Sequence, residues 1–104
     1  MPASSRRVPT LSSKETLILE LLIRDKELYG LQLVATSRRR LKRGTVYVTL
    51  ARMEDKGYIT SRLESPPPDA GGLPRRLYAP TALGRRVLAA WTDVARRLVP
   101  EFAR

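Results

Sequence analysis

The groups available for chemistry in this chain are cations, hydroxyls and small apolar side chains, because its 104 residues include no Cys and no His. Disulfides, thiol nucleophiles, imidazole bases and the ordinary zinc or transition-metal sites are therefore excluded. The ten carboxylates are scattered and no glycine-rich phosphate loop is present, so the sequence does not indicate an enzyme. We expect no catalytic residue, no metal site and no cofactor.

Methyl groups, hydroxyls and basic side chains come together in one segment, residues 44–57, which has the periodicity of a helix. Val46, Leu50 and Met53 form one apolar face, and Gly57 follows where a helix commonly ends in a left-handed cap. The opposite face mixes methyls, hydroxyls, a phenol and one arginine. This mixture suits the major groove of DNA, in which methyls meet thymine and arginine binds guanine with two hydrogen bonds. The alternative is an ordinary amphipathic helix with small surface residues.

The chain has 20 basic and 10 acidic residues and a formal net charge of +10. Residues 38–62 alone hold eight basic and two acidic residues. Such a surplus is typical of a protein with a polyanionic partner. The hydrophobic content of 42% predicts one folded domain with a modest core. The longest apolar run, residues 17–23, is too short to cross a bilayer and no signal region is present, so we expect a cytoplasmic protein without a membrane partner.

Two further helices are expected before this segment. Residues 1–10 are polar and basic and predict a flexible arm, with or without a role in phosphate contact. Ser12 and Glu15 have the spacing of a capping box and begin the first helix. A weaker helical pattern over residues 31–37 is followed by three arginines at 38–40. Two helices, a basic break and a third helix follow the order of a helix-turn-helix motif.

A β-hairpin is expected after the third helix. Residues 58–64 and 75–79 are strand-like, and the gap between them is too rich in proline and glycine to form a helix. A hairpin in this position is a wing. Arg62, Arg75 and Arg76 flank it, either as phosphate contacts or as the solvated charges that are common on edge strands.

The last helix opens at Thr81, which is expected to be its N-cap. Its apolar stripe is wider than a small monomer can easily cover, so we expect a second copy of the chain to cover it. Trp91, the only tryptophan, would either fill the core of its own chain or seal the contact between copies. The stripe residues expected at the interface between copies are Leu83, Val87, Leu88, Trp91, Val94, Ala95 and Leu98.

Three motifs resemble the PadR-like winged-helix transcriptional regulators over most of the chain, from about residue 11 to residue 91. The match to their recognition helix is Leu41-x-x-Gly44-Thr45-Val46-Tyr47-x-x-Leu50-x-Arg52-Met53-Glu54-x-x-Gly57-x-Ile59. The match to their wing and last helix is Pro74-Arg75-Arg76-x-Tyr78-x-x-Thr81-x-x-Gly84-Arg85, and Leu28-Tyr29-Gly30 stands where they have a short element before the second helix. The chain departs from the family at Val48, where a proline is usual, and at Lys42 and Arg43, which leave the recognition helix without a side-chain oxygen cap.

The resemblance implies a homodimer that represses transcription and is built from the first and last helices. It therefore adds Leu17 and Leu21 to the expected dimer interface. Some members sense aromatic molecules, so the two copies of Trp91 could also face each other and leave a slot for a planar aromatic effector.

We therefore predict a mainly α protein with a small β-hairpin (α+β), a winged helix-turn-helix over residues 11–80 and a dimerisation helix over residues 81–104. It should read the major groove of double-stranded, palindromic operator DNA with residues 44–57, and the backbone with the wing over 58–80. A basic RNA- or nucleoid-binding protein without sequence preference is the alternative, although few aromatic residues are available for stacking on bases. The expected DNA contacts are Arg38, Arg39, Arg40, Lys42, Arg43, Gly44, Thr45, Tyr47, Val48, Thr49, Arg52, Arg62, Arg75 and Arg76.

Overall fold

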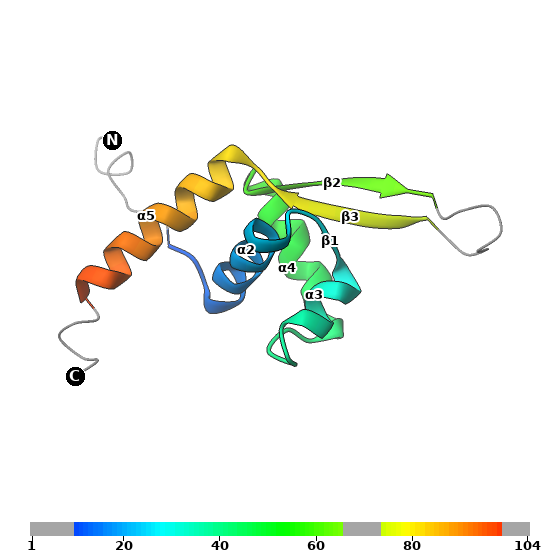
Figure 1. Ribbon diagram of the computed structural model, residues 1–104, viewed down its shortest axis with the longest axis horizontal. Coiled ribbons are helices and arrows are strands. Elements are labelled where there is room, and N and C mark those ends of the chain that lie inside the picture. Colours follow the sequence, from blue (N-terminus) through cyan, green and yellow to red (C-terminus); the bar gives the residue numbers. More distant parts are fainter. Residues whose placement is uncertain (1–9, 66–73, 99–104) are drawn as a thin grey trace.

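Helices gather at the centre of the molecule, with a hairpin on one side and a long last helix on the other (Figure 1). The computed structural model describes residues 10–65 and 74–98. Most of the predicted basic arm and of the proline-rich wing tip lies outside these residues. The α+β winged-helix fold predicted from the sequence is confirmed. Its elements are α2 (Ser13–Asp25), β1 (Leu28–Tyr29), α3 (Gly30–Thr36), α4 (Arg43–Asp55), β2 (Ile59–Glu64), β3 (Arg75–Pro80) and α5 (Ala82–Leu98).

The predicted capping box starts α2 and also connects it to α4. The Glu15 amide donates to Ser12 Oγ at 3.1 Å, and the Ser12 amide donates to Glu15 Oε1 at 2.9 Å. Lys56, which caps the end of α4, donates from Nζ to Glu15 Oε2 at 2.9 Å. Burial would raise the pKa of Glu15, but these hydrogen bonds and the charge of Lys56 outweigh it and hold the pKa below its usual range.

The junction between α4 and α5 is built on two glycines. Gly57 has a φ of +82°, the left-handed conformation predicted for the residue that ends α4. Thr81 is the predicted N-cap of α5, since its Oγ1 accepts from the Gly84 amide at 2.9 Å. The same hydroxyl donates to the Gly57 carbonyl oxygen at 2.6 Å. A Cβ atom on Gly84 would lie 2.0 Å from the Tyr58 carbonyl oxygen, so α5 begins at a contact that only glycine permits.

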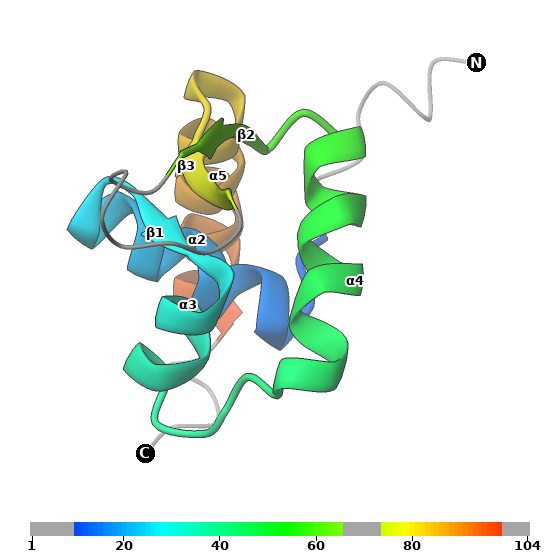
Figure 2. The same ribbon diagram turned by 90° about the vertical axis from the view of Figure 1, so that its right-hand side faces the viewer.

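The core lies between α2, α3 and α4. The predicted stripe of α4, namely Val46, Leu50 and Met53, is almost fully buried. It belongs to the same core as Leu19 and Leu22 of α2, which are also fully buried. A view along the hairpin shows α4 standing at one side of the molecule, so its other face is open (Figure 2). Among the described helices, none has both the length and the apolar character needed to cross a bilayer.

The sheet has three antiparallel strands in the order β1–β3–β2, and β1 was not predicted. β3 pairs with β2 along its length, from Ile59 opposite Pro80 to Glu64 opposite Arg75. The two residues of β1 pair with the other edge of β3, where Tyr29 lies opposite Leu77. Because α3 begins directly after Tyr29, this short strand fixes the root of the wing against the helix-turn-helix.

Candidate nucleic-acid interface

The outward face of α4 carries methyl groups, hydroxyls and one guanidinium. Val48 is 53% exposed, and Thr45 and Arg52 are also exposed. The hydroxyls of Thr45 and Thr49 donate to backbone carbonyls of the preceding turn, at 3.4 and 3.3 Å, which leaves their oxygens free to accept hydrogen bonds. Arg52 has no carboxylate within ion-pairing distance among the described residues. This face can therefore offer both apolar and hydrogen-bonding groups to a partner.

A buried serine shapes the turn that leads into α4. Ser37 Oγ accepts from the Leu41 amide at 3.0 Å and donates to the Val34 carbonyl at 2.8 Å. Between these anchors, Arg38 and Arg39 adopt positive φ angles of 56° and 73°. Such angles are uncommon for residues other than glycine. The serine thus forces two exposed arginines into a tight left-handed turn.

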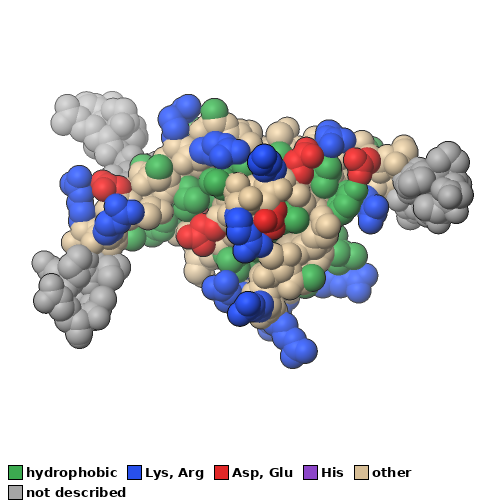
Figure 3. Space-filling model, in the orientation of Figure 1, with side chains coloured by type: hydrophobic (Ala, Val, Ile, Leu, Met, Phe, Trp, Pro, Cys, Tyr) green, Lys and Arg blue, Asp and Glu red, His purple; other side chains and the backbone are tan. Residues whose placement is uncertain are grey.

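Positive charge surrounds the first turn of α4. Arg38, Arg39, Lys42 and Arg43 are exposed, and basic side chains gather at the lower end of the view in Figure 3, below α3. Lys42 is the N-cap residue and provides no side-chain hydrogen bond, as the sequence indicated. The first amides of α4 therefore add the partial positive charge of the helix dipole to that of the side chains. This end of α4 is suited to an anion.

Arg40 does not join the other turn arginines at α4. Its Nε donates to the Ser37 carbonyl oxygen at 3.3 Å, and its side chain lines a depression beside Leu17 and Trp91. It lies against the start of α2, where it also shares a small depression with Lys14. The sequence run 38–40 suggested a single basic group, but the left-handed turn sends its members in different directions.

A groove of about 470 Å³ runs between the start of α2 and the outward face of α4. Lys14 lines it together with Thr45, Val48 and Arg52. Lys14 is not among the DNA contacts expected from the sequence. The capping box placed it in the first turn of α2, but nothing local showed that this turn lies beside α4.

Tyr47 points from α4 toward α3. A Cβ atom on Gly30 would lie 2.5 Å from the Tyr47 ring, so the ring occupies space that only glycine leaves open. Gly30 and Tyr47 belong to two different motifs of the sequence, and this contact explains why the chain has both: the tyrosine ring fits only beside a glycine. Tyr47 is 45% exposed, and it lines a groove together with Pro74, Arg75 and Arg76 at the start of β3.

The wing arginines are divided between the two faces of the hairpin. Side chains alternate along a strand, and Arg76 lies on the face toward α4, where it donates to Ser61 Oγ at 3.0 Å. Arg62 lies on the other face and pairs with Glu27 at 3.3 Å and with Glu64 at 3.6 Å. Arg62, which the sequence placed with Arg75 and Arg76 as a phosphate contact or a solvated charge, therefore pairs with two carboxylates and lies on a different face from Arg76.

Arg75 shares the face of Arg62 but has an aromatic partner. Its guanidinium lies 4.2 Å from the centre of the Tyr29 ring. The Tyr29 hydroxyl donates to Glu64, and this hydrogen bond is the main reason that the pKa of Tyr29 is raised. Arg75 is therefore held by stacking, which leaves its N–H groups open to a further partner.

A family model described as the transcriptional regulator PadR-like family matches residues 18–90, which include α3, α4 and the hairpin. The chain belongs to the PadR-like family. Its members are regulators of transcription, so the surface around α4 lies in a DNA-binding type of fold. A comparison with curated proteins found no match.

Solved structures of PadR-like regulators have the same fold. A PadR family transcription regulator from hypervirulent Clostridium difficile is 27% identical with a TM-score of 0.72, over 89% of this chain and 100% of that one. A PadR family regulator from Eggerthella lenta is 26% identical with a TM-score of 0.73, over 86% and 77% of the two chains. Bacillus subtilis PadR, solved with operator DNA, is 24% identical with a TM-score of 0.70, over 81% and 48%.

The residues predicted to form the dimer interface of this PadR-like chain fall into two groups. Leu17, Leu21 and Val87 are buried within their own chain, so they belong to its core and offer little surface to a second copy. Helix α5 packs against α2 within the same chain, and these three side chains belong to that core. The second group consists of the predicted interface residues on α5 that remain accessible, namely Leu83, Leu88, Trp91, Val94, Ala95 and Leu98.

Trp91 is half-buried and packs against the edge of the core. It lines an open depression of about 410 Å³, together with Leu17, Thr16 and Arg40. Thr16 Oγ1 is buried there without a hydrogen-bond partner among the described residues. Trp91 therefore fills part of the core of its own chain. Its exposed part is available for the two other predicted roles, which are sealing the contact between copies and binding an aromatic effector.

Proposed function

We propose that this chain is a homodimeric, sequence-specific DNA-binding repressor of transcription. The observation that carries the proposal is the outward face of α4, on which Thr45, Val48 and Arg52 are exposed without acidic partners among the described residues. Non-specific binding needs only positive charge. A face of methyls and hydroxyls centred on one unpaired arginine is better explained by contacts to base edges.

Two kinds of contact are proposed. Residues 44–52 enter the major groove, where Val48 meets a thymine methyl and Arg52 binds guanine. Lys14, Lys42, Arg43 and Arg76 contact phosphates around them and fix the register of the protein on the duplex. Arg38 and Arg39 extend the positive surface beyond the first turn of α4. Arg62 has no direct role in this arrangement, because it is paired with Glu27 and Glu64.

Bacillus subtilis PadR, which has the same fold, was solved with operator DNA, and this supports DNA as the partner. A dimer would place two copies of α4 on two half-sites of a palindromic operator. The accessible second half of α5, which ends with Leu98 at 58% exposure, supports that pairing. We retain Trp91 as a candidate contact for an aromatic effector at the dimer interface.

Selection of bound duplexes from a random pool is the direct test. A homodimeric, sequence-specific protein should enrich one palindromic consensus, whereas a basic RNA- or nucleoid-binding protein should enrich none. Arg52→Ala should then cost about 1–3 kcal/mol at one position of each half-site if the contact to guanine is bidentate.

Arg76→Ala is the matched control for this substitution, because it removes the same charge from the wing. It should weaken all duplexes to a similar extent and reduce the slope of log affinity against log salt by about one unit. If the two variants lose affinity equally on specific and random duplexes, the assignment of Arg52 to base reading is wrong.

A further inference from the structure

Three polar side chains connect the end of α4 to the wing. Glu54 lies in the last turn of α4, Ser61 lies on β2 and Arg76 lies on β3. Ser61 Oγ donates to Glu54 Oε2 at 2.9 Å and accepts from Arg76 Nη1 at 3.0 Å. Ser61 is half-buried, whereas both charged side chains are exposed. A single hydroxyl therefore stands between a carboxylate of α4 and a cation of the wing.

The strand register places these groups on one face of the hairpin. Ser61 lies opposite Tyr78 and Leu63 lies opposite Arg76, so Ser61 and Arg76 are diagonal neighbours on the same face. Burial raises the pKa of Tyr78, and the nearby charges act on it in opposite directions, since Arg76 lowers it and Glu54 raises it. Both charged groups are thus close to the same buried phenol, which agrees with their connection through Ser61.

The chemistry of the three groups fixes the direction of both hydrogen bonds. A guanidinium can only donate, and an ionised carboxylate can only accept. The one proton of the hydroxyl must therefore go to Glu54, while its oxygen accepts from Arg76. Serine satisfies both partners at once, whereas the methyl group of alanine would satisfy neither.

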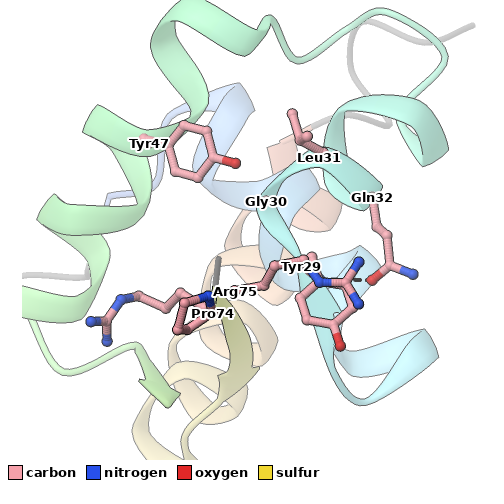
Figure 4. A pocket seen from close by; sticks show the side chains of 8 residues that line it. Tyr29, Gly30, Leu31, Gln32, Tyr47, Pro74 and Arg75 are labelled. Carbon is pink, nitrogen blue, oxygen red and sulfur yellow. Dashed lines mark hydrogen bonds between the residues drawn. The ribbon is translucent and has the colours of Figure 1, made fainter. Parts of the chain in front are cut away.

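The hydroxyl holds Arg76 in place and leaves its charge available. No carboxylate lies within ion-pairing distance of Arg76 among the described residues. Arg62, on the other face of the wing, shows the opposite arrangement, because two glutamates pair with it directly. Arg75 is also on that other face and lies 4.2 Å from the centre of the Tyr29 ring (Figure 4). Of these three arginines, Arg76 is the one held toward α4 without a direct ion pair.

We propose that Ser61 is a positioning residue for the contact between the wing and DNA, which fixes Arg76 beside α4 and prevents it from pairing with Glu54. This role rests on the proposed function, in which Arg76 contacts a phosphate. A cation that is already held in place loses less side-chain freedom when the phosphate arrives. A cation that is paired with a carboxylate must first break that pair. The hydroxyl thus orients the guanidinium without neutralising it.

Removal of the hydroxyl should bring the two charges together. Glu54 and Arg76 have long, exposed side chains, and only the Ser61 oxygen separates them. In Ser61→Ala a direct ion pair should form, as it does at Arg62. The affinity for selected and random duplexes should then fall about fivefold, and the slope of log affinity against log salt should decrease by about one unit, as in Arg76→Ala. The consensus should stay the same, because the exposed face of α4 is unchanged.

The assay is fluorescence anisotropy of labelled duplexes with the full-length chain at several salt concentrations. Ser61→Thr keeps the hydroxyl on a strand that tolerates β-branched residues, so it should bind within about twofold of the wild type. Thr60→Ala is the matched control, because it removes a hydroxyl from the exposed, neighbouring position on the opposite face of β2. It should also bind within about twofold of the wild type.

Two double variants separate positioning from a general structural role. In the Arg76→Ala background, Ser61→Ala should change the affinity by less than about twofold, because the side chain that it positions is absent. Glu54→Gln should restore most of the affinity lost in Ser61→Ala, since the amide carries no charge to pair with Arg76. Asp55→Asn removes the same charge from the next residue, which is also exposed, and should have the same small effect in Ser61→Ala as in the wild type.

The outcomes distinguish this proposal from the proposed function. Wild-type affinity in Ser61→Ala would overturn the proposal, and so would an undiminished effect of Ser61→Ala in the Arg76→Ala background. Failure of Glu54→Gln to restore binding, with the fold intact by circular dichroism, would also overturn it. A selection that enriches no consensus would refute sequence-specific binding, while the affinities for random duplexes would still test Ser61. A clear consensus that the wild type and Ser61→Ala bind equally would refute the role of Ser61 alone.

Discussion

Substitution of Gly84 by alanine tests how α5 is attached to the winged helix-turn-helix. The new Cβ atom would lie 2.0 Å from the Tyr58 carbonyl oxygen and 3.2 Å from Leu19 Cδ2. Since real Cβ contacts are not closer than 3.0 Å, the start of α5 must retreat by about 1 Å. The opposing atom is backbone, and it also accepts from the Thr81 amide at 3.0 Å, so it cannot move aside freely.

The expected loss combines three effects. Overpacking of this kind costs about 1–3 kcal/mol. Weakening the Thr81 hydrogen bond adds roughly 0.5–1.5 kcal/mol, and the better helix propensity of alanine returns up to about 1 kcal/mol. We expect Gly84→Ala to lower the free energy of unfolding by about 1–3 kcal/mol, which corresponds to a fall in Tm of roughly 5–20 °C for a domain of this size.

Thermal unfolding followed by circular dichroism at one fixed protein concentration is the assay, because the Tm of a dimer depends on concentration. Gly44→Ala is the matched control, since nothing lies within 4 Å of its added Cβ atom. It should leave the Tm unchanged or raise it by a few degrees, by roughly the helix propensity of alanine. Equal melting of the two variants would refute the view that the Tyr58 contact positions α5.

The remaining predictions concern pH, association and Trp91. Glu15→Gln keeps the capping box but loses the charge, so it should lower stability by about 1 kcal/mol at pH 7. Folding lowers the pKa of Glu15, so the ionised carboxylate stabilises the fold fully above the unfolded pKa of about 4.3. This stabilisation is lost as the pH falls below that value. The free energies of unfolding of the wild type and of Glu15→Gln, measured by chemical denaturation, should therefore become equal in acid. Leu98→Asp should dissociate the proposed dimer and abolish operator binding, and a wild type that is monomeric by light scattering at micromolar concentration would contradict this. Trp91→Ala should keep the dimer and lose affinity for planar aromatic dyes that quench wild-type fluorescence; a variant that unfolds or dissociates would make the indole structural.

Local signals in the sequence predicted local structure well. Ser12 and Glu15 are three residues apart, and Gly57 follows α4 directly, so the chemistry of each helix end is contained within a few residues. Val46, Leu50 and Met53 could be assigned to the core because only one face of α4 repeats with helical spacing. The hairpin followed from proline and glycine in its connection.

Features that depend on distant pairs were missed. β1 has only two residues, and its partner strand is almost fifty positions away, so no periodicity marks it. The pairing of Arg62 with Glu27 depends on how the wing lies beside the end of α2. Val87 was placed in the expected dimer interface because apolar spacing is the same for a surface that meets its own chain and one that meets a partner, whereas Leu17 and Leu21 were placed there by the family resemblance; all three are buried within the chain.

The left-handed conformation of Arg38 and Arg39 has a consequence for how this chain could be stabilised. The left-handed conformation destabilises a residue other than glycine by about 1–2 kcal/mol, and asparagine is destabilised less than most. Replacing both arginines by glycine or asparagine would therefore raise the melting temperature while it removes two positive charges beside α4. A screen for thermal stability alone would select against the basic turn, and a screen for retention on duplex DNA would restore it.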